Sequence, residues 1–87
     1  MEDIKEQLKE GTFYYTKCGL YIKSKIEIVL EFNKDCLSAN FKNGCVDIYR
    51  DKVKKVKRPS NVIEEFEWCY ELKNEYNEHI GYIGKTK

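Results

Sequence analysis

The sequence predicts an α+β fold: a short N-terminal helix, an antiparallel meander of four to five strands, and a C-terminal amphipathic helix packed on the sheet. Three observations lead to this prediction. Apolar residues alternate along 26–50, Asn43-Gly44 is a typical hairpin turn, and the apolar residues of 61–80 gather on one side of a helical projection. The length of 87 residues predicts one small globular domain.

Residues 26–50 form the predicted meander of three strands. Ile26, Ile28, Leu30 and Phe32 occupy alternate positions, and the same period of two follows in 37–41. Because successive side chains of a strand point to opposite faces, this pattern places these four apolar residues on one buried face.

Two turns set the expected register of the meander. Two-residue loops at 34–35 and 43–44 bring the apolar rows of all three strands onto a common face, and a slip of one residue would turn a strand over. The predicted cross-strand pairs are Phe32 with Leu37, Leu30 with Ala39, Ile28 with Phe41, Phe41 with Val46, and Ala39 with Ile48.

The segments before the meander predict a helix and further strands. Ile4 and Leu8 lie one helical turn apart in 1–10, and Gly11 follows as a stop signal. The aromatic and β-branched stretch 12–25, with a turn at Gly19, predicts one or two strands that extend the sheet.

The basic segment 50–58 has two interpretations. Val53 and Val56 are spaced for a helical turn, but lysines also protect an exposed edge strand. As a fifth strand, it would give an order that resembles an Sm-like or SH3-like barrel in shape, although the sequence contains no recognisable Sm motif.

Residues 61–80 are predicted to be a helix, with a β-hairpin as the alternative. Ser60 or Asn61 would cap the helix, Asn61 and Glu64 would form a capping box, and Gly81 would end it. The alternation of Phe66, Trp68, Tyr70 and Leu72 supports the hairpin instead. The tail 82–87 is expected to be a short strand or frayed.

Composition and charge favour an intracellular protein. The net charge is only +1, with basic residues in excess in 1–60 and glutamates in excess in 61–80. There is no apolar signal region and no stretch long enough to span a bilayer, so we expect a cytoplasmic location, in the host cytoplasm if a phage encodes the protein. The four cysteines lack C-x-x-C spacing and are expected to be free thiols, with a disulfide or a zinc site as the alternative.

No motif indicates catalysis. His79 is the only histidine, and no phosphate loop, dinucleotide fingerprint or metal-ligand spacing occurs. We therefore expect no enzyme activity, no catalytic residue, no cofactor and no metal.

Two charged surfaces are candidate binding sites. The acidic side of the predicted helix, with Trp68 at its edge, would fit a basic groove on a protein partner, and the tyrosines suit contact surfaces. The basic segment would neutralise phosphates in a nucleic-acid complex. The predicted partner-binding residues are Trp68, Glu64, Glu67, Glu71, Glu75 and Tyr49. The alternative nucleic-acid-binding residues are Arg50, Lys52, Lys54, Lys55, Lys57 and Arg58.

We therefore expect a small, non-enzymatic interaction module that binds a protein partner and inhibits or modulates it. Abundant Lys, Asn, Ile and Tyr indicate AT-rich codons and a low-GC host. Together with the small size, this favours a phage or mobile-element accessory protein with a counter-defence role. The alternatives are a nucleic-acid-binding module that uses 50–58, and a small-ligand or nucleotide-binding homo-oligomer.

Overall fold

The structure, a computed structural model, describes residues 3–8, 11–16, 24–42, 44–60 and 62–87. It contains one short α-helix, one 3-10 turn and eight strands in these ranges. The elements are α1 (Ile4–Gln7), β1 (Thr12–Thr16), β2 (Ser24–Lys25), β3 (Ile28–Asn33), β4 (Cys36–Phe41), β5 (Gly44–Tyr49), η1 (Arg50–Lys52), β6 (Lys54–Lys55), β7 (Phe66–Lys73) and β8 (His79–Thr86).

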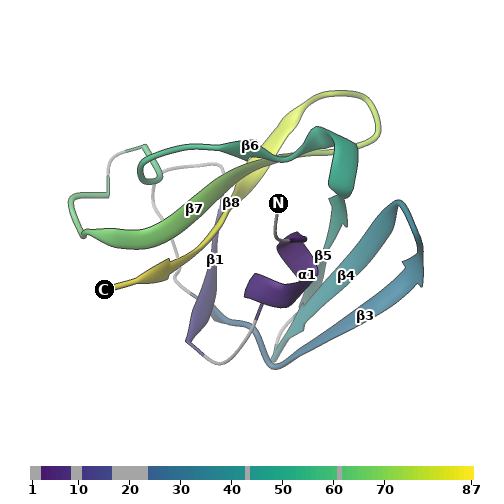
Figure 1. The fold of residues 1–87 in the computed structure, drawn as a ribbon, viewed down its shortest axis with the longest axis horizontal. Helices are drawn as coiled ribbons and strands as arrows, with labels where there is room; N and C mark the ends of the chain where they lie inside the picture. Colours follow the sequence, from purple (N-terminus) through teal and green to yellow (C-terminus); the bar gives the residue numbers. More distant parts are fainter. Residues whose placement is uncertain (1–2, 9–10, 17–23, 43, 61) are drawn as a thin grey trace.

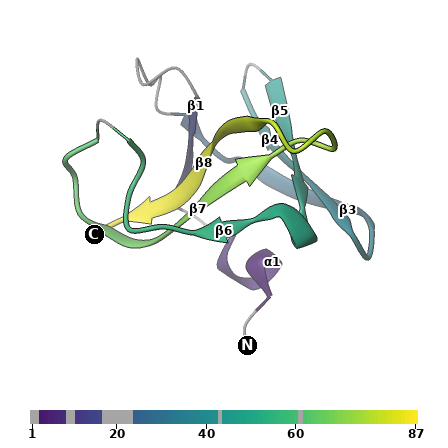
Figure 2. The same cartoon turned by 90° about the horizontal axis from the view of Figure 1, so that it is seen from above.

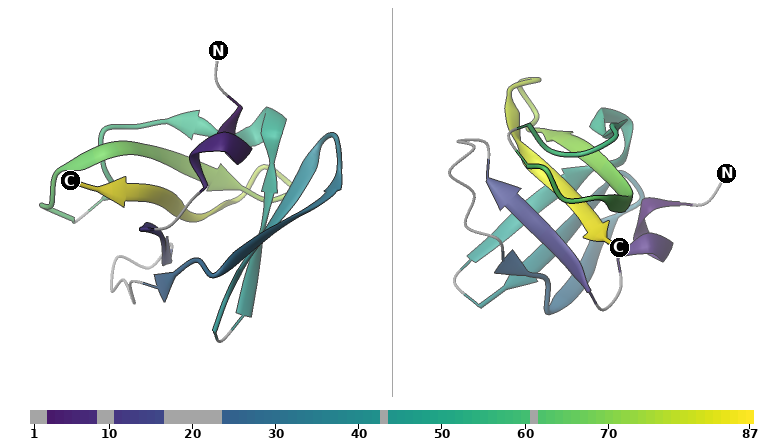
Figure 3. Two further views of the ribbon diagram at one scale, coloured as in Figure 1. Left: turned by 60° about the horizontal axis from the view of Figure 1, so that its bottom comes forward. Right: turned by 90° about the vertical axis from the view of Figure 1, so that its left-hand side faces the viewer.

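The strands form two antiparallel sheets. The larger sheet has the order β2-β1-β8-β7-β6, and the smaller sheet has the order β3-β4-β5 (Figure 1). The chain passes from one sheet to the other at Ile26 and Glu27: Ile26 N–H donates to Thr12 O of β1, and Glu27 N–H donates to Asn40 O of β4. Figure 3 shows the strands of the two sheets crossing at a steep angle.

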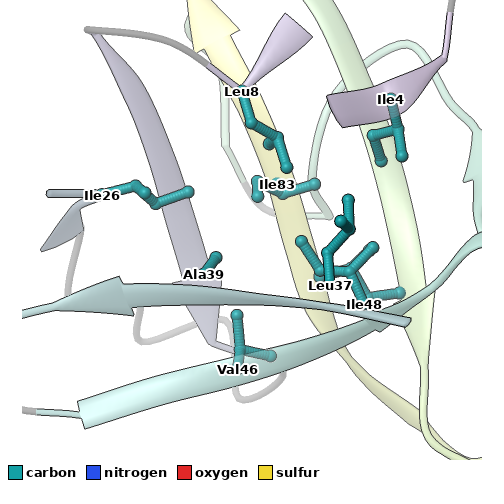
Figure 4. Close-up of a cluster of buried hydrophobic side chains, with 9 residues drawn as sticks. Ile4, Leu8, Ile26, Leu37, Ala39, Val46, Ile48 and Ile83 are labelled. Carbon is teal, nitrogen blue, oxygen red and sulfur yellow. The ribbon is translucent and has the colours of Figure 1, made fainter. Parts of the chain in front are cut away.

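The main hydrophobic core lies between the two sheets. Leu37 and Ile48 of the smaller sheet and Ile83 of β8 are fully buried there (Figure 4). Ile4 and Leu8, from α1 and the residue after it, complete this cluster, so the short helix is held by its apolar side chains.

A second cluster covers the outer face of the larger sheet. Tyr15, Phe66 and Cys69 are buried with Val62 of the β6–β7 connection, and the rings of Tyr15 and Phe66 meet edge to face at 5.5 Å. Figure 2 shows this connection beside the C-terminal end of β8, where Lys87 N–H donates to Glu65 O. Strand β7 is therefore buried on both faces.

The predicted C-terminal helix is wrong, and with it the α+β class: the domain is nearly all β. Residues of 61–80 instead contribute β7 and the start of β8, as the hairpin alternative expected. A strand buried on both faces carries apolar residues at odd and even positions, and such a distribution also fills one side of a helical projection. Ile63, which the projection placed inside, is 87% exposed.

An asparagine turn joins β7 to β8. Asn74 Oδ1 accepts hydrogen bonds from the N–H groups of Tyr76 and Glu78, and Asn74 N–H donates to Glu78 O. Asn77 has a φ of 65°, a conformation that asparagine tolerates better than most residues. These local bonds favour a reversal of the chain over a continuous helix.

The three-strand meander is confirmed, but its first strand is turned over. Asn33 lies opposite Cys36, so the two-residue loop at 34–35 is as predicted. A bulge between Glu31 and Asn33 then adds one residue, and Glu31 instead of Phe32 lies opposite Leu37. The predicted pairs of Phe32 with Leu37, Leu30 with Ala39 and Ile28 with Phe41 are therefore wrong.

The pairing across the second turn differs from its prediction by two residues. Phe41 lies opposite Gly44 and Ala39 opposite Val46, so the predicted pairs of Phe41 with Val46 and Ala39 with Ile48 are wrong. Because a shift of two residues preserves the faces, Val46 and Ile48 still point into the core as expected.

The remaining predictions are tested in part. Two strands, β1 and β2, occur within 12–25, and β8 extends through most of the predicted tail. Cys36, Cys45 and Cys69 are free thiols. Gly19, Cys18 and the cap residue Asn61 lie outside the described residues. Within the described ranges, no helix has the length and hydropathy needed to cross a bilayer.

Candidate functional site

The turned-over strand β3 exposes a row of apolar side chains. Ile28, Leu30 and Phe32 are 55%, 49% and 65% exposed, and they occupy alternate positions of one strand. We call these three residues the β3 row. Among the described strands β3 pairs only with β4, so it forms an edge of the smaller sheet (Figure 1). The row therefore lies beside backbone groups that a further strand could pair with.

Polar side chains flank the β3 row on β4. Leu30 lies opposite Ser38, and Ile28 lies opposite Asn40. Asn40 Nδ2 donates to Ser38 Oγ at 3.4 Å, so these two side chains are joined to each other and leave the apolar row as a separate strip. An exposed apolar strip bordered by polar residues is typical of an interaction surface.

An ion-pair cluster holds β3 in the turned-over register. Arg50 Nη2 contacts Glu31 Oε2 at 2.7 Å and Asp3 Oδ2 at 2.9 Å, and Lys5 Nζ contacts Glu31 Oε1 at 3.3 Å. Arg50 Nη1 also donates to Lys34 O at 2.7 Å. Glu31 alternates with the residues of the β3 row, so its side chain points to the opposite face of the strand. A register shifted by one residue would turn Glu31 away from Arg50 and Lys5 and would bury the β3 row.

The cluster also changes the acidity of its carboxyl groups. The hydrogen bonds from Arg50 lower the pKa of Asp3, and those from Arg50 and Lys5 lower the pKa of Glu31. The same two carboxylates raise the pKa of Arg50. Both carboxylates therefore stay charged in the folded protein at pH values where free carboxyl groups begin to protonate.

The predicted partner-binding residues are not brought together on one acidic helix face. Trp68 lies half-buried on β7, packed against the main core and 5.7 Å from the Tyr70 ring, so its prediction as the exposed edge of such a face is wrong. Glu67 contacts Lys85 at 3.7 Å, and Glu71 contacts His79 Nδ1 at 2.9 Å.

The other three predicted residues lie in separate places. Glu64 is exposed in the β6–β7 connection, and Glu75 is exposed in the β7–β8 turn. Tyr49 ends β5 half-buried; burial and the nearby Glu75 carboxylate raise its pKa. Partner binding by these residues stays a prediction.

The basic segment is divided among different roles. Arg50 is held in the ion-pair cluster, and Lys52 Nζ donates to Asn77 Oδ1 at 2.8 Å. Lys54 and Lys55 form β6, an exposed edge strand, where lysines oppose the addition of another strand. Nucleic-acid binding by this segment stays a prediction.

A shallow depression of about 270 Å³ adjoins the end of the basic segment. Its lining carries both signs of charge, and Lys87 there is paired with Glu65 at 3.8 Å. This mixture does not favour one class of charged ligand. The lining residues are Lys57, Arg58, Ile63, Glu64, Glu65, Phe66 and Lys87.

The thiols differ in accessibility. Burial raises the pKa of Cys69 to about 12 and also raises the pKa of Cys36, whereas Cys45 is exposed on β5. The two buried thiols are therefore poor nucleophiles at neutral pH. In the part of the chain that the structure describes, no three His, Cys, Asp or Glu side chains are grouped to hold a metal ion.

Comparison with known protein families, with curated proteins and with solved structures finds no match for this chain. The candidate site therefore depends on the geometry of the molecule. Sequence reasoning missed the β3 row because Ile28, Leu30 and Phe32 have the pattern of a buried face. The signal that would have found it, the pairing of Glu31 with Arg50, joins residues far apart in the sequence.

Proposed function

We propose that this chain is a non-enzymatic protein-binding module and that the β3 row is its binding surface. The observation that carries the proposal is the outward position of Ile28, Leu30 and Phe32, each about half exposed or more, on an edge strand. Exposed apolar side chains in a contiguous row cost solvation free energy, and a protein partner that covers them recovers it.

The geometry favours a partner that adds an extended strand. A strand placed beside β3 would pair with the backbone groups that have no partner among the described strands, and apolar side chains at alternate positions would pack against the β3 row. Inhibition or modulation of the partner, and a phage or counter-defence role, stay predictions at this stage.

Selection from a displayed library of short random peptides tests this proposal. At low protein concentration, we expect the enriched peptides to carry apolar residues at every second position. Leu30→Lys should abolish their binding, because a charge in the middle of the row would have to be desolvated.

Ile63→Lys is the matched control, because Ile63 is also apolar and exposed but lies in the β6–β7 connection. Its peptide binding should equal that of the wild type. Selection without any enriched peptide, or peptides that bind the Leu30→Lys variant as well as the wild type, would contradict the proposed surface.

A further inference from the structure

We propose that the strand that pairs with β3 is the β3 strand of a second copy of this chain. The two strands would run antiparallel about a two-fold axis at Leu30, joining two three-stranded sheets into one. This inference rests on the proposed protein-binding role of the β3 row, and it names the partner.

The two-fold symmetry keeps the apolar residues on one face. An axis normal to the sheet places Leu30 opposite Leu30 of the second copy and Ile28 opposite Phe32 of the second copy. Residues on the outer face of one copy therefore lie opposite residues on the outer face of the other. The two β3 rows then form one continuous apolar strip across the joint, and the cross-strand pairs within it stabilise the pairing.

The glutamates select this register over its neighbours. An axis at Leu30 places Glu31 opposite Val29 and Glu27 opposite Asn33. An axis at Glu31 would place two Glu31 carboxylates opposite each other, and an axis at Val29 would place Glu27 opposite Glu31. Directly opposed like charges destabilise a strand pair, and an axis at either end of β3 would pair only part of the strand.

The other sheet edges contrast with β3. Strand β6 is two residues long and consists of Lys54 and Lys55, and β2 is also two residues long. Strand β5, the other edge of the smaller sheet, lies against β7. Strand β3 has six residues, Ile28–Asn33, and none of them is lysine, arginine or proline. Of the features by which proteins block the addition of a strand, β3 therefore lacks lysine and proline, and its bulge between Glu31 and Asn33 lies near one end and leaves 28–31 in regular pairing with β4.

Sedimentation velocity over a range of concentrations tests the dimer. The wild type should shift with concentration from the 10.4 kDa monomer to a species of twice that mass. Leu30→Lys should stay monomeric at every concentration, because it opposes two ammonium groups at the axis. Circular dichroism of the variant should match that of the wild type, since Leu30 is 49% exposed. Ile63→Lys, the matched control, should dimerise like the wild type.

Disulfide cross-linking tests the register. In a Cys45→Ser background, Leu30→Cys should form a disulfide between two copies under mild oxidation, identified by mass spectrometry of the linked peptides, because opposed residues lie at disulfide distance. Ile63→Cys should not form one. A monomeric wild type, a Leu30→Lys dimer, or cross-linking at residue 63 but not at residue 30 would overturn the inference.

The failure of the dimer and the failure of the proposed function give different results. A wild type that stays monomeric but still selects alternating apolar peptides through Leu30 would overturn the dimer only. A monomeric wild type that selects no peptide would overturn both.

Discussion

Arg50 joins three parts of the chain through one side chain. It contacts Asp3 before α1, Glu31 of β3 and the carbonyl oxygen of Lys34 in the β3–β4 turn. The Asp3 and Glu31 side chains are 45% and 40% exposed, so solvent weakens each ion pair. Arg50 therefore contributes to the fold mainly by fixing the position of α1 and the register of β3 at the same time.

Replacing Arg50 should lower stability in a pH-dependent way. For Arg50→Gln we expect the melting temperature at pH 7 to fall by about 5 °C. Because the pKa values of Asp3 and Glu31 are lowered in the folded state, their contribution is complete above the ordinary carboxyl range and is lost as the pH falls below about 4. The difference between wild type and variant should therefore shrink in acid.

Thermal melts followed by circular dichroism at pH 7 and pH 3 measure this effect. Arg58→Gln is the matched control, since Arg58 is exposed at the end of the basic segment. It should leave the melting temperature nearly unchanged. A difference between wild type and Arg50→Gln that stays constant with pH would show that Arg50 acts through packing and not through charge.

At the scale of elements, the β7–β8 pair lies between the two hydrophobic clusters. The strands approach each other closely at Gly84, where a Cβ atom would lie 2.7 Å from the carbonyl oxygen of Trp68 and 3.0 Å from Cδ2 of Phe66. Backbone atoms cannot move aside without a shift of the whole strand, so this position requires glycine.

Gly84→Ala should therefore lower the free energy of unfolding by about 1–3 kcal/mol, as overpacked core substitutions do. Urea denaturation followed by tryptophan fluorescence, which reports on Trp68 of β7, measures the change. Gly44→Ala is the control, because a Cβ atom at this position would lie 3.6 Å from its nearest neighbour, a carbon of the Phe41 ring. Equal destabilisation by the two substitutions would refute the close approach at Gly84.

The sequence predicted β4 and β5 correctly because each strand carries apolar residues at alternate positions that face the core. Val46 and Ile48 alternate with exposed residues and point into the core as predicted. Strand β7 was mistaken for a helix because it is buried on both faces, so the buried Cys69 stands between the alternating Trp68 and Tyr70 and widens the apolar side of a helical projection. Only the neighbours on each side, Ile83 of β8 and Val62 of the connection, distinguish the two structures.

At the scale of the whole molecule, the position of the β3 row depends on contacts that no local pattern contains. The bulge at Phe32 shifts the pairing of β3 with β4 by one residue, and Arg50 and Lys5 bind Glu31 in the register that results. Apart from Tyr49, the partner-binding residues were predicted from a helix that does not form, and none of the predicted residues belongs to the β3 row. Composition and charge contained no information about this surface.

The register of β3 is the central claim, because both proposals depend on the outward position of the β3 row. Nuclear Overhauser contacts between backbone protons of β3 and β4, in the isotope-labelled protein, measure it directly. The structure predicts contacts of Glu31 with Leu37 and of Val29 with Ala39. Contacts of Phe32 with Leu37 and of Leu30 with Ala39 would contradict it, since that register buries the β3 row and leaves no binding surface.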